Sequence, residues 1–134
     1  MSGRVFSAVP GSSMRREELR LRDILEAADA IAAFLQGKTR ADFLRDDALR
    51  SGVLFKLAVI GEAASRIAPD FRKRYPEVEW EDIVAFRNIL VHEYFAVRWP
   101  TIWDTATEDV PALRRKIAFV LSQEFPASPG RPEG

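Results

Sequence analysis

Cysteine is absent from this chain of 134 residues, and histidine occurs once, at His92. The absence of cysteine excludes disulfide bonds and thiolate metal sites. A zinc site would have to be built mostly from carboxylates, whereas zinc sites in proteins rely on histidine and cysteine. We therefore predict neither a metal ion nor another cofactor.

An excess of one charge is also missing, since twenty basic and twenty acidic residues give a formal net charge of zero. Proteins that coat nucleic acids broadly are usually basic, because neutralising phosphates supplies most of their non-specific affinity. A nucleic acid would have to be held here by a local basic cleft. Net charge limits affinity but does not decide whether a strand can be cut.

Long apolar runs are lacking too. No run approaches the roughly 20 residues that span a bilayer, and no basic start followed by an apolar core marks a secretory signal. We therefore expect no membrane association and a cytoplasmic location. Hydrophobic residues at 47% and charged residues at 30% are typical of a globular protein, and 134 residues fit one domain.

Both ends of the chain differ in composition from its middle. Residues 1–13 are small and polar and read as a tag remnant or an upstream start. Residues 126–134 are rich in proline, glycine and serine, which predicts a disordered tail. The folded domain is expected over residues 14–125.

Inside this domain, apolar residues recur with a helical period and no segment shows strand alternation. The pattern predicts main helices over about 21–35, 53–67, 80–92 and 100–120, with Thr39 as the cap of a short turn. Pro111 should kink the last helix, because proline removes a backbone hydrogen bond and clashes with the preceding turn. Gly61 lies inside the second main helix, so a packing reason for it is expected. The predicted fold is an all-α antiparallel bundle of four or five helices.

The segment from Arg87 to Tyr94, which contains the single histidine, carries the clearest chemical signal. Histidine is the side chain that exchanges a proton near neutral pH. Arginine offers a rigid fork of donors that suits a phosphate and keeps its charge throughout. Together they could cleave a phosphodiester by acid–base chemistry without a metal ion.

This order of residues, an arginine, four residues, a histidine, any residue and a tyrosine, resembles the signature of HEPN ribonucleases and in particular of the HepT-like toxins. The resemblance extends over most of the chain. It includes the sequence of residues 14–25, the stretch 57–66, the turn at 75–80 and the last helix from residue 97 to 111, with Ile102, Trp103 and Asp104.

The resemblance implies a HEPN-like helical fold and the toxin of a toxin–antitoxin pair, a metal-independent endoribonuclease whose composite site forms between two copies in a homodimer. We assign His92 as general acid or base and Arg87 as the group that stabilises charge on the phosphate. Asn88 would orient His92 or donate to a phosphate oxygen. In the family, a tyrosine matching Tyr94 receives AMP groups from an MNT-type nucleotidyltransferase antitoxin.

The spacing within the motif constrains its geometry. Five residues on an ideal helix separate Arg87 and His92 by about 140°, so they converge only if the helix ends or distorts near His92, or if a second chain supplies one of them. Asn88 and His92 share a face. We place Ile83, Val84, Leu90 and Val91 on the core side, which would leave Arg87 and Asn88 on or beside the opposite face.

Each assignment has a structural alternative. His92 could serve as a helix-terminal residue that complements the helix dipole, and Tyr94 could pack half-buried beside Phe95. Glu62 could approach the cleft or form a structural salt bridge. The basic run Arg72, Lys73 and Arg74 could contact RNA phosphates or form a solvated face.

The residues after His92 depart from the family pattern. Glu93 stands where relatives commonly have glycine, and Arg98 and Pro100 follow where relatives often have an acidic residue. The negative charge of Glu93, which we place at the cleft, could weaken phosphate binding, or it could favour the protonated form of the histidine and help it act as an acid.

A rival function follows from the same residues. The bundle could be a non-catalytic nucleotide- or partner-binding subunit of a nucleotidyltransferase, whose arginine, histidine and tyrosine hold an adenylyl group and never cut RNA. A structural dimerisation protein is a third alternative.

Overall fold

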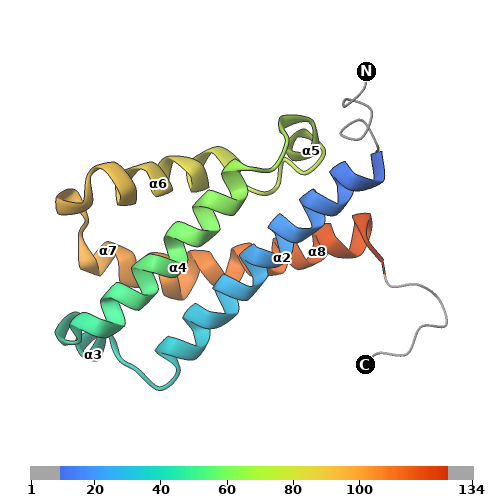
Figure 1. Ribbon diagram of the computed structural model, residues 1–134. Helices are drawn as coiled ribbons and strands as arrows, with labels where there is room; N and C mark the ends of the chain where they lie inside the picture. The colour runs from blue at the N-terminus through green and yellow to red at the C-terminus, as the bar shows by residue number, and fades with distance from the viewer. Residues whose placement is uncertain (1–9, 127–134) are drawn as a thin grey trace.

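The computed structural model describes residues 10–126, with side chains from Met14 onward. Successive main helices run in opposite directions (Figure 1). They are α2 (Pro10–Leu35), α4 (Asp47–Ser65), α6 (Trp80–His92) and α8 (Val110–Glu124). Shorter helices lie between them: α3 (Arg40–Arg45), α5 (Pro69–Lys73) and α7 (Trp99–Asp104). The described residues contain no strand. The predicted all-α bundle is confirmed.

The first helix begins earlier than predicted. Pro10 starts α2, and proline is favoured at the first helical position because its missing N–H would have had no partner there. Residues 10–13, placed by us in the leader, are therefore helical. Residues 1–9 and 127–134, the remainder of the predicted leader and nearly all of the predicted tail, lie outside the described residues.

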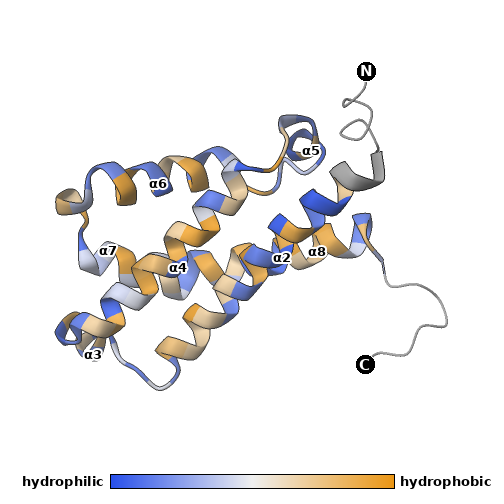
Figure 2. Cartoon of the chain, viewed as in Figure 1, coloured by the Kyte–Doolittle hydropathy of each residue, from blue (hydrophilic) through white to orange (hydrophobic). Residues whose placement is uncertain are grey.

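The core lies where α2 packs on α4 and α8, and where α4 packs on α6. Hydrophobic and hydrophilic residues alternate along these helices, as expected for helices with one buried side (Figure 2). Each fully buried aliphatic or aromatic side chain contributes on the order of 1.5–3 kcal/mol. The largest of them are Phe43, Leu21, Ile24, Ile31, Ile67, Ile102, Ile117, Val53 and Val120.

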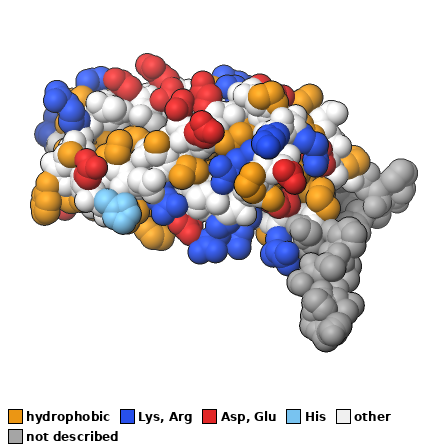
Figure 3. All heavy atoms as spheres, turned by 90° about the horizontal axis from the view of Figure 1, so that it is seen from above, with side chains coloured by type: hydrophobic (Ala, Val, Ile, Leu, Met, Phe, Trp, Pro, Cys, Tyr) orange, Lys and Arg blue, Asp and Glu red, His pale blue; other side chains and the backbone are white. Residues whose placement is uncertain are grey.

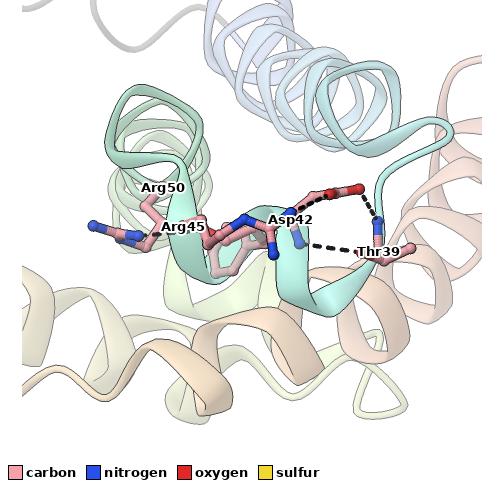
Figure 4. A network of polar contacts seen from close by, with 5 residues as sticks. Thr39, Asp42, Arg45 and Arg50 are labelled. Carbon is pink, nitrogen blue, oxygen red and sulfur yellow. Dashed lines mark hydrogen bonds and ion pairs between the residues drawn. The ribbon is translucent and has the colours of Figure 1, made fainter.

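The turn between α2 and α4 is fixed by local capping. Gly37 has φ 75°, a left-handed conformation that ends α2. Thr39 then caps α3: its hydroxyl accepts from the N–H of Asp42 at 3.1 Å, and its own N–H donates to the Asp42 carboxylate at 2.9 Å (Figure 4). Asp46 caps α4 by accepting from the N–H of Leu49 at 3.0 Å. The predicted cap at Thr39 is confirmed.

The last helix is interrupted just before Pro111. Between α7 and α8, the π-helix η2 (Thr105–Asp109) widens the turn, and the N–H of Val110 donates to the carbonyl of Thr105. A π-turn absorbs the missing N–H of a proline, and Pro111 accordingly lies in the first turn of α8. The irregularity that we expected at Pro111 is thus a π-bulge on its N-terminal side.

Candidate active site

The motif helix α6 has well-defined ends. The indole N–H of buried Trp80 donates to the carbonyl of Tyr75 at 3.0 Å and fixes the start of the helix. The helix continues through His92, and the N–H of Glu93 closes it by donating to the carbonyl of Ile89 at 2.9 Å. The 3₁₀ turn η1 (Tyr94–Ala96) follows directly.

Arg87 does not lie on the outer side of α6, and our placement of it there was wrong. Its side chain is only 21% exposed, and its Cβ packs against α4 at Gly61. On a helix Arg87 is about 40° from Ile83 and about 60° from Leu90, so it belongs to the same inward stripe as these residues. Asn88, one residue later, is exposed.

Gly61 makes this close approach of the two helices feasible. A Cβ atom added at Gly61 would lie 2.2 Å from Cβ of Arg87 and 2.7 Å from its Cγ. Glycine is therefore needed at position 61 because the Cβ and Cγ atoms of Arg87 occupy the space that a side chain would fill.

Two arginines share the carboxylate of Glu62. Arg87 Nη1 lies 3.4 Å from Glu62 Oε1, and Arg66 Nε lies 2.8 Å from Glu62 Oε2. Arg87 Nε is buried and has no hydrogen-bond partner. Glu62 therefore forms salt bridges with both arginines, which is the structural one of the two alternatives that the sequence left open.

The other motif residues are open to solvent. Asn88, His92 and Glu93 are exposed, and among the described residues no hydrogen bond or ion pair engages their side chains. In the view from above, the histidine lies at the surface, with hydrophobic, basic and acidic side chains around it (Figure 3). Because α6 is unbroken from Arg87 to His92, the helix does not bring the two residues to one face.

The turn after His92 exposes two aromatic rings. Tyr94 is 47% exposed and Phe95 is 98% exposed. The rings meet edge to face, with centroids 5.5 Å apart and an interplanar angle of 78°. Tyr94 is thus accessible and not enclosed by the core.

The basic run at the C-terminal end of α5 is largely engaged within the chain. Arg72 donates to the carbonyls of Ile67 at 3.0 Å and Ser65 at 3.1 Å and so caps the end of α4. Arg74 pairs with Glu124 at 2.7 Å and stacks over Phe71. Of the predicted RNA contacts Arg72, Lys73 and Arg74, Lys73 alone makes no such interaction among the described residues.

The described residues contain no group of three or more His, Asp or Glu side chains that could hold a metal ion. None of the helices in the described part of the chain is long and apolar enough to cross a membrane.

A family profile described as "Ribonuclease HepT-like" matches residues 24–120, which include the whole motif. The chain belongs to this family. It is 35% identical over 108 residues to a protein of Methanocaldococcus jannaschii named "Putative RNase", with 81% of this chain and 99% of the relative covered. It is 38% identical over 97 residues to a protein of Thermococcus cleftensis named "Probable ribonuclease HepT", with 72% of this chain and 88% of the relative covered. No solved structure matches the chain at a significant level.

Two features of this HepT-like site were missed from the sequence. Arg66 joins Arg87 at Glu62, and the spacing of four residues between Glu62 and Arg66 could have indicated the pair. The near-complete exposure of Phe95 had no sequence signal, because an aromatic residue after a helix end is as consistent with packing as with exposure.

Proposed function

We propose that this HepT-like chain is a metal-independent endoribonuclease, with His92 and Arg87 as its catalytic residues. The proposal depends on the different environments of these two residues, which lie on the same helix of a HepT-like fold. Arg87 is anchored against Gly61 and Glu62, whereas His92 is exposed at the helix end. Such an arrangement offers a fixed cation and an accessible acid–base group.

The chemistry needs no cofactor. A neutral His92 imidazole takes the proton of the ribose 2′-hydroxyl, and the 2′ oxygen attacks phosphorus. The bond to the 5′ oxygen breaks, and that oxygen receives a proton from an imidazolium, which leaves a 2′,3′-cyclic phosphate and a 5′-hydroxyl. Arg87 stabilises the added negative charge on the phosphate oxygens, and Asn88 orients the imidazole or donates to a phosphate oxygen.

The site is completed by a second copy of the chain. Arg87 and His92 are about 140° apart around an unbroken helix, so one phosphate is reached most readily by groups from two chains. Two adjoining surface grooves support this pairing, since both are lined by Phe55 and Ala58, one reaching Glu62 and the other Tyr94. We call this surface the α4–α6 face. A homodimer through it would place two motifs together.

Tyr94 is the residue through which the toxin is neutralised. An AMP group transferred to its hydroxyl by an MNT-type nucleotidyltransferase antitoxin adds an anion two residues from His92, which blocks the cleft and competes for Arg87. The exposure of the Tyr94 side chain supports this assignment. Mass spectrometry of the chain co-expressed with the transferase tests it.

His92→Ala tests the nuclease. We expect cleavage of a single-stranded RNA to fall by about 10²–10⁴, the usual effect of removing a positioned acid–base group. Gln123→Ala, at an exposed position on α8, is the matched control and should cleave as the unaltered chain does. Circular dichroism should show the same helix content in all three proteins. If His92→Ala cleaved RNA as fast as the unaltered chain, His92 would not be the acid–base group.

One observation favours the non-catalytic alternative. Arg87 is occupied by Glu62 in the described chain, as expected of an arginine that holds a structural contact. A chain that forms a stable complex with a nucleotidyltransferase, and cleaves no RNA at any concentration at which it dimerises, would be a binding subunit.

A further inference from the structure

We propose that Phe95 is a stacking platform for an unpaired nucleobase next to the scissile phosphate, so that the substrate is single-stranded RNA. This inference rests on the proposed ribonuclease function and adds the means by which the strand is positioned. Phe95 acts as a substrate-binding residue and takes no part in proton transfer.

Exposure alone does not carry the inference, since single apolar side chains are common on protein surfaces. Phe95 differs in degree and in place. It is 98% exposed, the highest fraction among the exposed large hydrophobic residues of the described chain, the next being Phe55 at 64%. It follows His92 by three residues, which at the rise of a 3₁₀ turn or an extended strand puts the two Cα atoms within about 10 Å of each other. That span is of the size of neighbouring nucleotides.

The ring is held on a fixed turn. The N–H of Ala96 donates to the carbonyl of Glu93 at 2.8 Å, and the N–H of Val97 donates to the carbonyl of Tyr94 at 3.1 Å. The edge-to-face contact with Tyr94 supports the ring from one side while leaving it almost wholly exposed. Because the backbone of the turn is already ordered, stacking a base on the ring restricts the side chain alone.

Two exposed charged residues lie close to Phe95 in the chain, Glu93 before it and Arg98 after it, and Arg98 is the one that can meet a phosphate. Arg98, three residues after Phe95, is exposed, and no ion pair engages it within the described residues. Recognition of single-stranded RNA combines aromatic rings that stack on bases with arginines that meet the phosphates.

Tryptophan fluorescence provides a direct test. Phe95→Trp is placed in the His92→Ala background, so that RNA is bound and not cut, and a single-stranded oligonucleotide is titrated. We expect saturable quenching beyond that of the His92→Ala chain, which has only the native tryptophans. Phe119→Trp in the same background, at a residue of α8 that is 50% exposed, is the matched control and should not be quenched further.

Affinity provides the second measurement. Loss of stacking on one base typically costs a factor of about 5–150. Phe95→Ala and Phe95→Leu should both weaken single-strand binding by this factor, whereas Phe95→Tyr should retain it. The leucine variant separates stacking from a subunit contact, because it keeps apolar bulk and loses the π face.

Three results would overturn the inference. They are RNA binding with no quenching of Phe95→Trp, full affinity in Phe95→Leu, and dissociation of Phe95→Ala into monomers, which would make the ring part of a protein interface. Cleavage by the unaltered chain decides the nuclease proposal separately. Quenching without cleavage would support the stacking role of Phe95 and contradict the nuclease proposal. Cleavage without quenching would support the nuclease and contradict the stacking role.

Discussion

The two tyrosines of this chain have opposite environments. Tyr75 is buried at 8% exposure, and its hydroxyl donates to the Glu124 carboxylate at the end of α8. Burial, followed by the bond to Glu124 and the charge of that carboxylate, raises the pKa of Tyr75 to about 12. The Tyr75 hydroxyl is thus buried, and it keeps its proton at neutral pH. Tyr94 projects from η1 and is 47% exposed.

This contrast predicts where AMP is added. Co-expression with an MNT-type nucleotidyltransferase should add AMP at Tyr94 and not at Tyr75, and peptide mass spectrometry locates the adduct. Tyr94→Phe should abolish the mass increase and leave the chain toxic, because the hydroxyl that accepts the group is gone while His92 remains. Tyr75→Phe is the control and should be modified as the unaltered chain is. An adduct at Tyr75, or none at either residue, would contradict the assignment.

At the scale of the elements, the pairing of α4 with α6 controls the motif. Within this packed pair Gly61 lies directly against Arg87, and the Glu62 salt bridge lies beside it. Any atom added at Gly61 must displace the base of the Arg87 side chain, because the neighbouring atoms are Cα, Cβ and Cγ, not the far end of a flexible chain. The position of the Arg87 guanidinium therefore depends on this approach.

Gly61→Ala and Gly52→Ala form a matched pair within α4. Alanine favours a helix interior by about 1 kcal/mol over glycine, and this gain applies to both. At Gly61 the clash adds an overpacking cost of about 1–3 kcal/mol, so the variant should lose stability or gain none, and RNA cleavage should fall because Arg87 moves. At Gly52 the nearest atom is Cε2 of Phe34, at 3.3 Å. That ring is 37% exposed and can shift.

Chemical denaturation and cleavage rates distinguish the two variants. Gly52→Ala should be neutral or more stable and fully active. If Gly61→Ala gained the same stability as Gly52→Ala and retained its rate, the close helix contact would not position the arginine.

At the scale of the whole molecule, the α4–α6 face is the surface on which a second copy is expected. Its exposed apolar residues include Phe55 at 64% and Val91 at 54%. A specific dimer buries roughly 800 Å² on each partner, with an apolar centre. Of the two grooves that Phe55 lines, one is also lined by Glu62 and the other by Tyr94, so an interface there would lie against the motif.

Phe55→Asp tests this arrangement. A carboxylate buried in an apolar interface is strongly unfavourable, so light scattering should show a monomer at micromolar concentration. The variant should cleave RNA at least about 100-fold more slowly, because each monomer lacks the catalytic group that the second copy supplies. Phe119→Asp changes an equally large exposed residue on α8 and should stay dimeric and active. If Phe55→Asp stayed dimeric and active, the dimer interface would have to lie on another face of the protein.

The sequence predicted the helices better than their relative orientation. Apolar periodicity placed the motif helix over residues 80–92, as observed, and local capping at Thr39 followed from residue type alone. The inward direction of Arg87 was misjudged, because a charged residue in an apolar stripe was assumed to face water. It faces α4 because Gly61 leaves space and Glu62 supplies a counter-charge.

The sequence by itself determined the all-α class, the helix boundaries near the motif and membership in the HepT-like family, since these follow from local periodicity, capping and residue order. Only the tertiary structure decided that Arg87 lies between α4 and α6, that Glu62 is shared by two arginines, and that Phe95 is exposed beside His92. These features depend on which surfaces of distant helices meet, and that is set by packing across the bundle and not by any local pattern.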